Sequence, residues 1–303
     1  MSKFFKIMVV ALMMLSVTNI YAGEQNLQVF SQNNADGKLD AKSVQKSFAS
    51  VGVIVDVNND MNSIFSKRYG SVQHKKYNLA IFTNDALVKK LMNKYPSIGM
   101  ITPLTMSIYQ DDGVLNITTL TLAGMARLTE IPASNPDLIA YAKLVDKALH
   151  KALPKGKYLS VKHDANAKVS VTKFSMELEV EDGDSISDAK ASFEEEFEGE
   201  ISPVGFLVPK KYEFDHEAYD FFDTYSIIRF NAIYPVQAKH PDAGAYAPFS
   251  VVMYKKKGED AMHIAYPSIT NWITDLGIQD KKTLKAVQET QAMMNDILSE
   301  LTE

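Results

Sequence analysis

The sequence predicts an α+β fold made of two similar domains in tandem, each an antiparallel sheet with helices on one face. The main evidence is an internal repeat. Residues 95–113, "YPSIGMITPLTMSIYQDDG", match residues 240–258, "HPDAGAYAPFSVVMYKKKG", at one constant offset. Apolar runs of strand length and segments with apolar residues at helical spacing surround both copies. The length agrees, because a domain has about 100–200 residues and the chain has 303.

The N-terminus has the order of a secretory signal peptide. Lys3 and Lys6 precede an apolar run over residues 7–17, and a polar stretch ends at Ala22. The run of 11 residues is shorter than the roughly 20 residues that span a membrane. We therefore expect cleavage after Ala22, export to a periplasm and a mature chain without a membrane span. Loss of the two lysines changes the formal net charge from −5 to −7.

The first expected domain, residues 23–160, begins with an amphipathic helix over 40–49. Glycine in "SVGVIVDVN" ends this helix, and the apolar residues after it predict a strand, as does "YNLAIF". A helix capped at Asn84 or Asp85 follows, and the repeat then leads into two further strands. A closing helix begins at Pro136 and has one apolar stripe: Leu138, Tyr141, Ala142, Val145 and Leu149.

The second expected domain, residues 161–303, has the same order. A helix over 187–197 precedes "PVGFLVPKK", and "YSIIRF" matches the "YNLAIF" strand of the first copy. On this pairing the following linker is three residues shorter and contains Pro235, so we expect only a stub of a helix there. A long helix from about 280 to 301 closes the domain.

Composition excludes several classes of function. Arginine occurs only at Arg68, Arg127 and Arg229, and nucleic-acid binding needs a concentrated basic face, so we expect no nucleic-acid partner. The absence of cysteine excludes disulfides, thiolate metal sites and c-type haem. The six histidines lack metal-ligand spacing, and the sequence contains no nucleophile elbow or phosphate loop. We expect no metal and no cofactor.

The order "VGVIVDVN … YNLAIFTN … YPSIGMITPLTMSIYQDDG … ITTL" resembles the DUF302 family, a domain of unknown function. The first copy covers roughly residues 27–153 and matches well, and the second, roughly 169–301, is more divergent. The resemblance implies a TATA-binding-protein-like topology of strand, helix, four strands and helix, often as a homodimer, and no established reaction. Many members have a cysteine directly after the second proline of the turn, where this chain has Leu104 and Phe249.

The repeated segment contains structural candidates. Gly99 and Gly244 are expected to allow backbone conformations that other residues resist. Pro103 and Pro248 are expected to begin strands where no amide donor is needed.

Five aromatic side chains are the candidate ligand-binding residues. Tyr109 and Tyr254 occupy matching strand positions, where a tyrosine buries its ring and presents a polar tip. Trp272 matches Arg127 of the first copy, so Trp272, with His263 and Tyr266 nearby, marks a surface special to the second half. Core packing of the tyrosines, and a buried anchor at Trp272, are the alternatives.

We interpret the chain as an exported protein whose two copies pack as a pseudo-dimer. Small-molecule sites favour domain interfaces, so the main hypothesis is binding of a small apolar or amphipathic ligand, or of a partner protein. The absence of a catalytic motif favours a role without catalysis. An enzyme that uses no cofactor, or a purely structural envelope or stress protein, are the alternatives.

Overall fold

The computed structural model describes residues 25–161, 170–180 and 183–303. The expected signal peptide, residues 1–22, lies outside these residues. The described residues form two similar halves, the first before residue 162 and the second after residue 169, and each half contributes one antiparallel sheet. The predicted α+β fold class is confirmed.

The two sheets have the same strand order. The first is ordered β2-β3-β4-β5-β1-β6, and the second, read from its β8 edge, is ordered β8-β9-β10-β11-β7. Among the described strands, only β6 has no counterpart in the other sheet. The strands of the first half are β1 (Leu27–Asn33), β2 (Ile54–Asp60), β3 (Lys76–Thr83), β4 (Leu104–Asp111), β5 (Val114–Leu120) and β6 (Lys157–Leu159). Those of the second half are β7 (Val171–Glu177), β8 (Phe206–Glu213), β9 (Tyr219–Arg229), β10 (Phe249–Lys256) and β11 (Ala261–Pro267).

Helices connect the strands in the same order in both halves, except that α2 has no counterpart between β8 and β9. The first half has α1 (Ala41–Ala49), α2 (Met61–Tyr69), α3 (Asp85–Met92), the 3₁₀ turn η1 (Pro96–Ile101), α4 (Leu122–Thr129) and α5 (Pro136–Ala152). The second has α6 (Ile186–Ile201), α7 (Phe230–Gln237), the 3₁₀ turn η2 (Pro241–Ala245), α8 (Asn271–Asp275) and α9 (Lys281–Thr302). Each half therefore has the strand, helix, four strands and long helix that the resemblance implies.

Local capping explains where the long helices begin. Asp40 forms a capping box with Ser43 at α1, Asn135 accepts the first amides of α5, and Asp280 accepts the Thr283 amide at α9. The predicted apolar stripe of α5 is buried along its whole length. No helix of the described residues is long and apolar enough to span a membrane.

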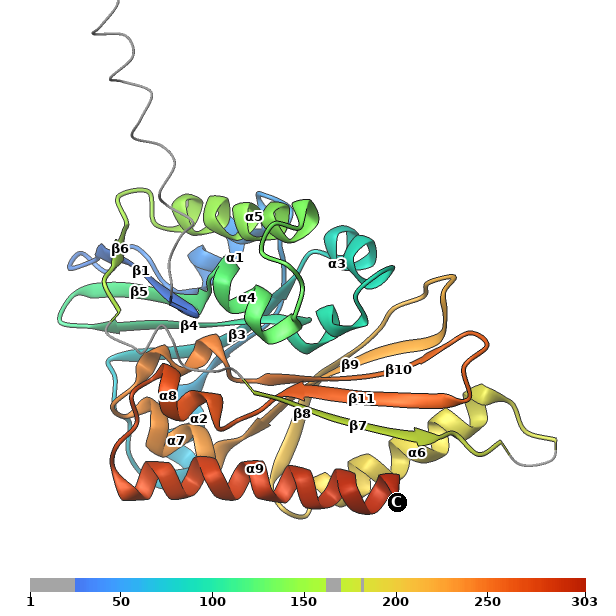
Figure 1. Cartoon of the computed structure of the whole chain (residues 1–303). Coiled ribbons are helices and arrows are strands. Elements are labelled where there is room, and N and C mark those ends of the chain that lie inside the picture. The colour runs from blue at the N-terminus through green and yellow to red at the C-terminus, as the bar shows by residue number, and fades with distance from the viewer. Residues whose placement is uncertain (1–24, 162–169, 181–182) are drawn as a thin grey trace, which may run out of the picture.

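The two sheets lie between the long helices. Figure 1 shows α5 and α1 on the outer side of the first sheet, and α9 and α6 on the outer side of the second. The inner faces meet through the 3₁₀ turns, because η2 packs on β4 and β5 while η1 packs on β10 and β11. The chain thus forms the pseudo-dimer that the duplication suggested.

The contacts between the halves are reciprocal. Nε2 of His74 lies 2.8 Å from the carbonyl oxygen of Gln237, and the hydroxyl of Tyr219 donates to the carbonyl oxygen of Met92 at 2.5 Å. Tyr219 and Gln237 are the residues 145 positions after His74 and Met92. The same contact therefore occurs twice: once from the first half to the second, and once from the second half to the first. A two-fold symmetric dimer has contacts of this kind.

Two expectations about the second half were wrong. Tyr77 pairs with Tyr109 and Phe222 pairs with Tyr254, so the partner of Tyr77 in the second half is Phe222 and not Tyr225. The linkers after these strands are then equally long. Accordingly α7 is a helix of 8 residues, like α3, and it continues through Pro235 rather than ending as a stub.

The repeated glycines have a different role from the expected one. Neither Gly99 nor Gly244 is among the residues with positive φ, so the expectation of an unusual backbone conformation was wrong. Both lie against the opposite half, where a Cβ would not fit. Pro103 and Pro248 directly precede β4 and β10, as expected, and both follow cis peptide bonds.

Candidate functional site

A cleft opens between the two halves at one end of their interface. Its volume is about 310 Å³. The first half lines it with η1, the residues just before η1 and the end of α4, and the second half lines it with β7, β10 and β11. Two of the five candidate ligand-binding residues, Tyr254 and His263, lie in this lining.

Stacked rings form the wall of the cleft. Tyr254 on β10 and His263 on β11 are cross-strand neighbours, with ring centroids 5.0 Å apart and planes inclined by 27°. On its other side Tyr254 stacks on Phe222 at 5.8 Å, and Tyr219 meets it edge-on at 5.9 Å. This packing holds Tyr254 in one orientation and makes this wall of the cleft largely aromatic, which suits an apolar body.

Charged side chains surround the mouth. Lys173 on β7 donates to Glu130 at the end of α4 over 2.7 Å, and both side chains are largely exposed. Lys94 lies over the Tyr95 ring, with Nζ 5.4 Å from its centroid. Within the described lining of the cleft, Lys173 is thus engaged by a carboxylate, whereas Lys94 forms no ion pair.

Burial keeps the tyrosines of the wall protonated. It raises the pKa of Tyr254, with the Glu259 carboxylate as a second cause. It also raises the pKa of Tyr219 to about 12, helped by Tyr254 and Glu259. Glu259 itself has a lowered pKa, chiefly because it accepts a hydrogen bond from Lys256. At neutral pH the Tyr254 hydroxyl is therefore protonated and can donate a hydrogen bond.

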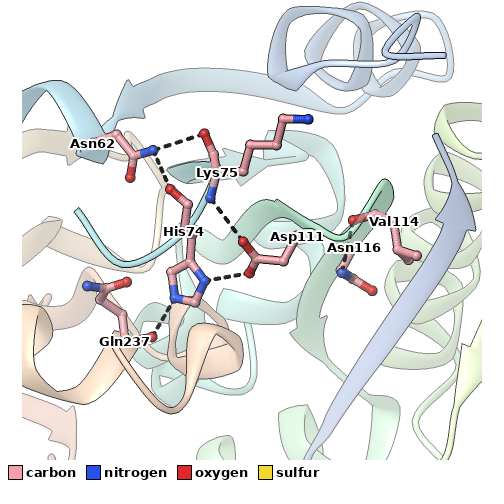
Figure 2. A network of polar contacts seen from close by, with 7 residues as sticks. All are labelled: Asn62, His74, Lys75, Asp111, Val114, Asn116 and Gln237. Atoms are coloured by element: carbon pink, nitrogen blue, oxygen red, sulfur yellow. Dashed lines mark hydrogen bonds and ion pairs between the residues drawn. The ribbon is translucent and has the colours of Figure 1, made fainter. Parts of the chain in front are cut away.

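In the first half the equivalent of Tyr254 is Tyr109. Tyr109 packs beside His74 and Tyr77, with centroid distances of 6.1 and 6.5 Å. Figure 2 shows how the segment before β3 is fixed there: Nδ1 of His74 lies 2.6 Å from Oδ2 of Asp111, and the Lys75 amide donates to Oδ1 of the same carboxylate. In the structure Asp111 anchors this segment.

A second network joins the two halves at Asp275. The Asn26 amide donates to both carboxylate oxygens of Asp275 at 2.9 Å, and the Tyr246 hydroxyl donates to Asp275 at 2.7 Å. Arg127 donates to the side-chain oxygen of Asn26. Asp275 is the counterpart of Glu130 at the repeat offset. At one end of the interface Asp275 holds the two halves together. At the other end its counterpart Glu130 borders the cleft.

The remaining candidates lie away from the cleft. Tyr266 is fully buried in the second half, where its hydroxyl donates to Asn295 and its oxygen accepts from Gln291. Trp272 is also buried and borders a void of about 20 Å³ near Pro103 and Pro248, which is room for one water molecule. Both side chains are therefore packed in the protein interior.

The shared topology and the reciprocal interface define one repeated unit, and its first copy is similar to known proteins. Residues 25–155 match the family model described as domain of unknown function DUF302. A crystal structure of an uncharacterized conserved protein DUF302 from Bacillus stearothermophilus is similar to 44% of this chain and 98% of that one, with 12% sequence identity and a TM-score of 0.34. A search of curated proteins finds none that matches.

The cleft combines residues of both halves, and this explains which residues sequence reasoning missed. Lys94, Tyr95 and Glu130 lie in the segment that matches the DUF302 model, yet the wall that they face is on β10 and β11. A signal was present at one position: Tyr95 lies in the repeat, where the second copy has His240. Within the described residues, no group of three or more histidine or acidic side chains could hold a metal ion.

Proposed function

We propose that the protein binds a small amphipathic molecule in the cleft between its halves. The observation that carries the proposal is the stacked wall of Tyr254 and His263 opposite Lys94, at an interface between two repeats. An apolar or aromatic body would lie on the wall, and an anionic or acceptor group would meet Lys94 and the Tyr254 hydroxyl. A volume of about 310 Å³ is at the small end of ligand pockets, which span about 300–1,000 Å³.

The duplication supports one ligand per chain. At the position equivalent to Glu130, the Asp275 hydrogen-bond network occupies the interface. A tandem chain allows such asymmetry, because the two copies can diverge independently, whereas a homodimer must change both ends together.

Export is part of the proposal. Its support is the order of residues 1–22, with two lysines, an apolar run and a small residue at the expected cleavage point. We expect the mature protein to begin at Gly23 in a periplasm. The intact mass of protein purified from that compartment checks the cleavage site directly.

The test of binding is native mass spectrometry on the exported protein after gentle purification, compared with its denatured mass. We expect an excess mass that disappears on denaturation. Tyr254→Ala and Lys94→Ala should each reduce the occupied fraction about tenfold or more, since a hydrogen bond to a charged group contributes about 1.5–3 kcal/mol.

Lys239→Ala is the matched control. Lys239 is the repeat counterpart of Lys94, but it pairs with Asp280 at 3.4 Å, away from the cleft. The control should retain the ligand. An apo mass in every preparation, or equal retention in all variants, would contradict the proposal and favour a protein partner or a structural role.

A further inference from the structure

We propose that a second, apolar cavity between the halves binds a small uncharged hydrophobic molecule. This cavity has a volume of about 260 Å³ and lies where β2 and β3 of the first sheet face β8 and β9 of the second. It shares no lining residue with the cleft of Tyr254. The inference therefore does not depend on the proposed function.

Strand register places apolar side chains on both walls. On the first sheet Val57 pairs with Ile81 and Asn59 pairs with Leu79, so all four share the inner face. On the second sheet Leu207 pairs with Ile228. Asn59 is the one polar residue of the described lining, and no charged residue belongs to it.

Irregular edge strands explain why the cavity exists. The pairing of β2 shifts between Val55 and Val57, and the pairing of β8 shifts between Leu207 and Lys210. Bulges bend an edge strand away from its ladder, and Pro209 lies within the second one. The inner faces therefore separate at this end, while a hydrogen bond from the Tyr212 hydroxyl to Asp56 joins the rims at 2.7 Å.

The lining determines the class of ligand. A charged or strongly polar molecule would lose its hydration without finding a partner, which is costly. Apolar cavities of about 150 Å³ stay dry and bind benzene, so about 260 Å³ has room for a bicyclic hydrocarbon or a short alkyl chain. Leu207, which lines the cavity, is 42% exposed. A ligand can therefore reach the cavity from solvent past this side chain.

Methyl NMR of the full mature chain, titrated with naphthalene, tests the inference. We expect shifts at the methyl groups of Ile81, Leu79 and Ile228, and not at Ile264 and Ala265 beside the cleft. Val57→Phe, which fills the cavity from the first sheet, should weaken naphthalene binding at least tenfold.

Ile54→Phe is the matched control, because Ile54 lies on the same strand, is 48% exposed and does not line the cavity. It should bind naphthalene as the unchanged protein does. Val208→Phe, from the opposite wall, replaces Val57→Phe if that variant does not fold. Absence of shifts at saturating naphthalene, shifts beside the cleft instead, or binding unchanged by both filling variants would overturn the inference.

Discussion

Gly99 and Gly244 show how single residues fix the distance between the halves. A Cβ on Gly99 would lie 2.3 Å from Cγ2 of Val252 and 3.0 Å from Cζ of Phe222. A Cβ on Gly244 would lie 2.4 Å from Cβ of Ser107 and 2.5 Å from its amide nitrogen. Ser107 and Val252 are themselves repeat counterparts. Each 3₁₀ turn therefore approaches the opposite sheet at the same point, and only glycine permits that approach.

We predict that Gly99→Ala destabilises the protein by about 1–3 kcal/mol, because overpacking a buried contact costs this much. Val252 is fully buried on a central strand and cannot move aside easily. Chemical denaturation of the variant measures the loss. Adding Val252→Ala should recover part of it, as a double-mutant cycle would show.

Gly199→Ala is the control for this prediction. Gly199 lies in α6, and a Cβ added there would have no neighbour within 4 Å, so alanine should stabilise the helix by about 0.5–1 kcal/mol. If Gly99→Ala were as stable as Gly199→Ala, the close approach of the two halves would not be a packing constraint.

The candidate residues differ in how far the sequence could place them. Comparing the two copies pointed to Tyr254, which repeats Tyr109, and to His263, which stands near the unmatched Trp272. The same reasoning selected Tyr266 and Trp272, which are core residues, since a buried aromatic and a cleft aromatic have the same local pattern. The sequence did not indicate Lys94, because its role depends on a surface of the other half.

At the level of elements, local signals were more informative than strand register. Helix starts at Asp40, Asn135 and Asp280 follow from one side chain and its neighbours in sequence. The register of β9 does not, because "YDFFDTYSIIR" offers aromatic residues at several positions that match Tyr77. Only pairing with β10 selects Phe222.

A buried ionic cluster joins α6 to β8 and β9. Asp223 on β9 is 2% exposed, with Lys190 of α6 at 2.5 Å and Lys211 of β8 at 3.7 Å. Lys211 also pairs with Glu194 at 2.7 Å. Burial raises the pKa of Asp223 to about 7, since desolvation outweighs the attraction of the two lysines. Glu194, on α6, therefore belongs to this cluster.

This raised pKa predicts a pH dependence for Asp223→Asn. The pKa of this carboxyl is higher in the folded state than its usual 3.8, so the folded protein holds the proton more tightly than the unfolded chain does. The contribution of the carboxyl to the free energy of unfolding therefore falls as pH rises from 3.8 to about 7. Asparagine has no such titration. The free energy of unfolding of the variant, relative to the unchanged protein, should therefore increase by at least about 1 kcal/mol between pH 5 and pH 8.

Urea denaturation at the two pH values measures this difference. Glu213, whose pKa is lowered mainly by its hydrogen bond to Lys211, is present in both proteins and cancels in the comparison. A difference that stays constant, or that decreases with pH, would show that Asp223 is ionised throughout and that its lysine contacts dominate.

For the whole molecule, the reciprocal contacts indicate what a single copy would do alone. The first half contains both partners of each contact type: Gly99 of one copy could meet Ser107 of another, just as Gly244 meets Ser107 in the chain. His74 of one copy could likewise meet the carbonyl of Met92, which already accepts from Tyr219. Its inner face also carries Leu79 and Ile81, which the second half buries.

We therefore predict that residues 25–161 expressed alone form a homodimer, because two copies restore the contacts that the second half provides and cover the same apolar face. Size-exclusion chromatography with light scattering measures the mass. Gly99→Ala in this fragment places a methyl group against Ser107 at both ends of a two-fold interface, so it should shift the fragment toward monomer or aggregate. A stable, soluble monomer without an exposed apolar face would show that the halves pack through contacts that a single copy does not possess.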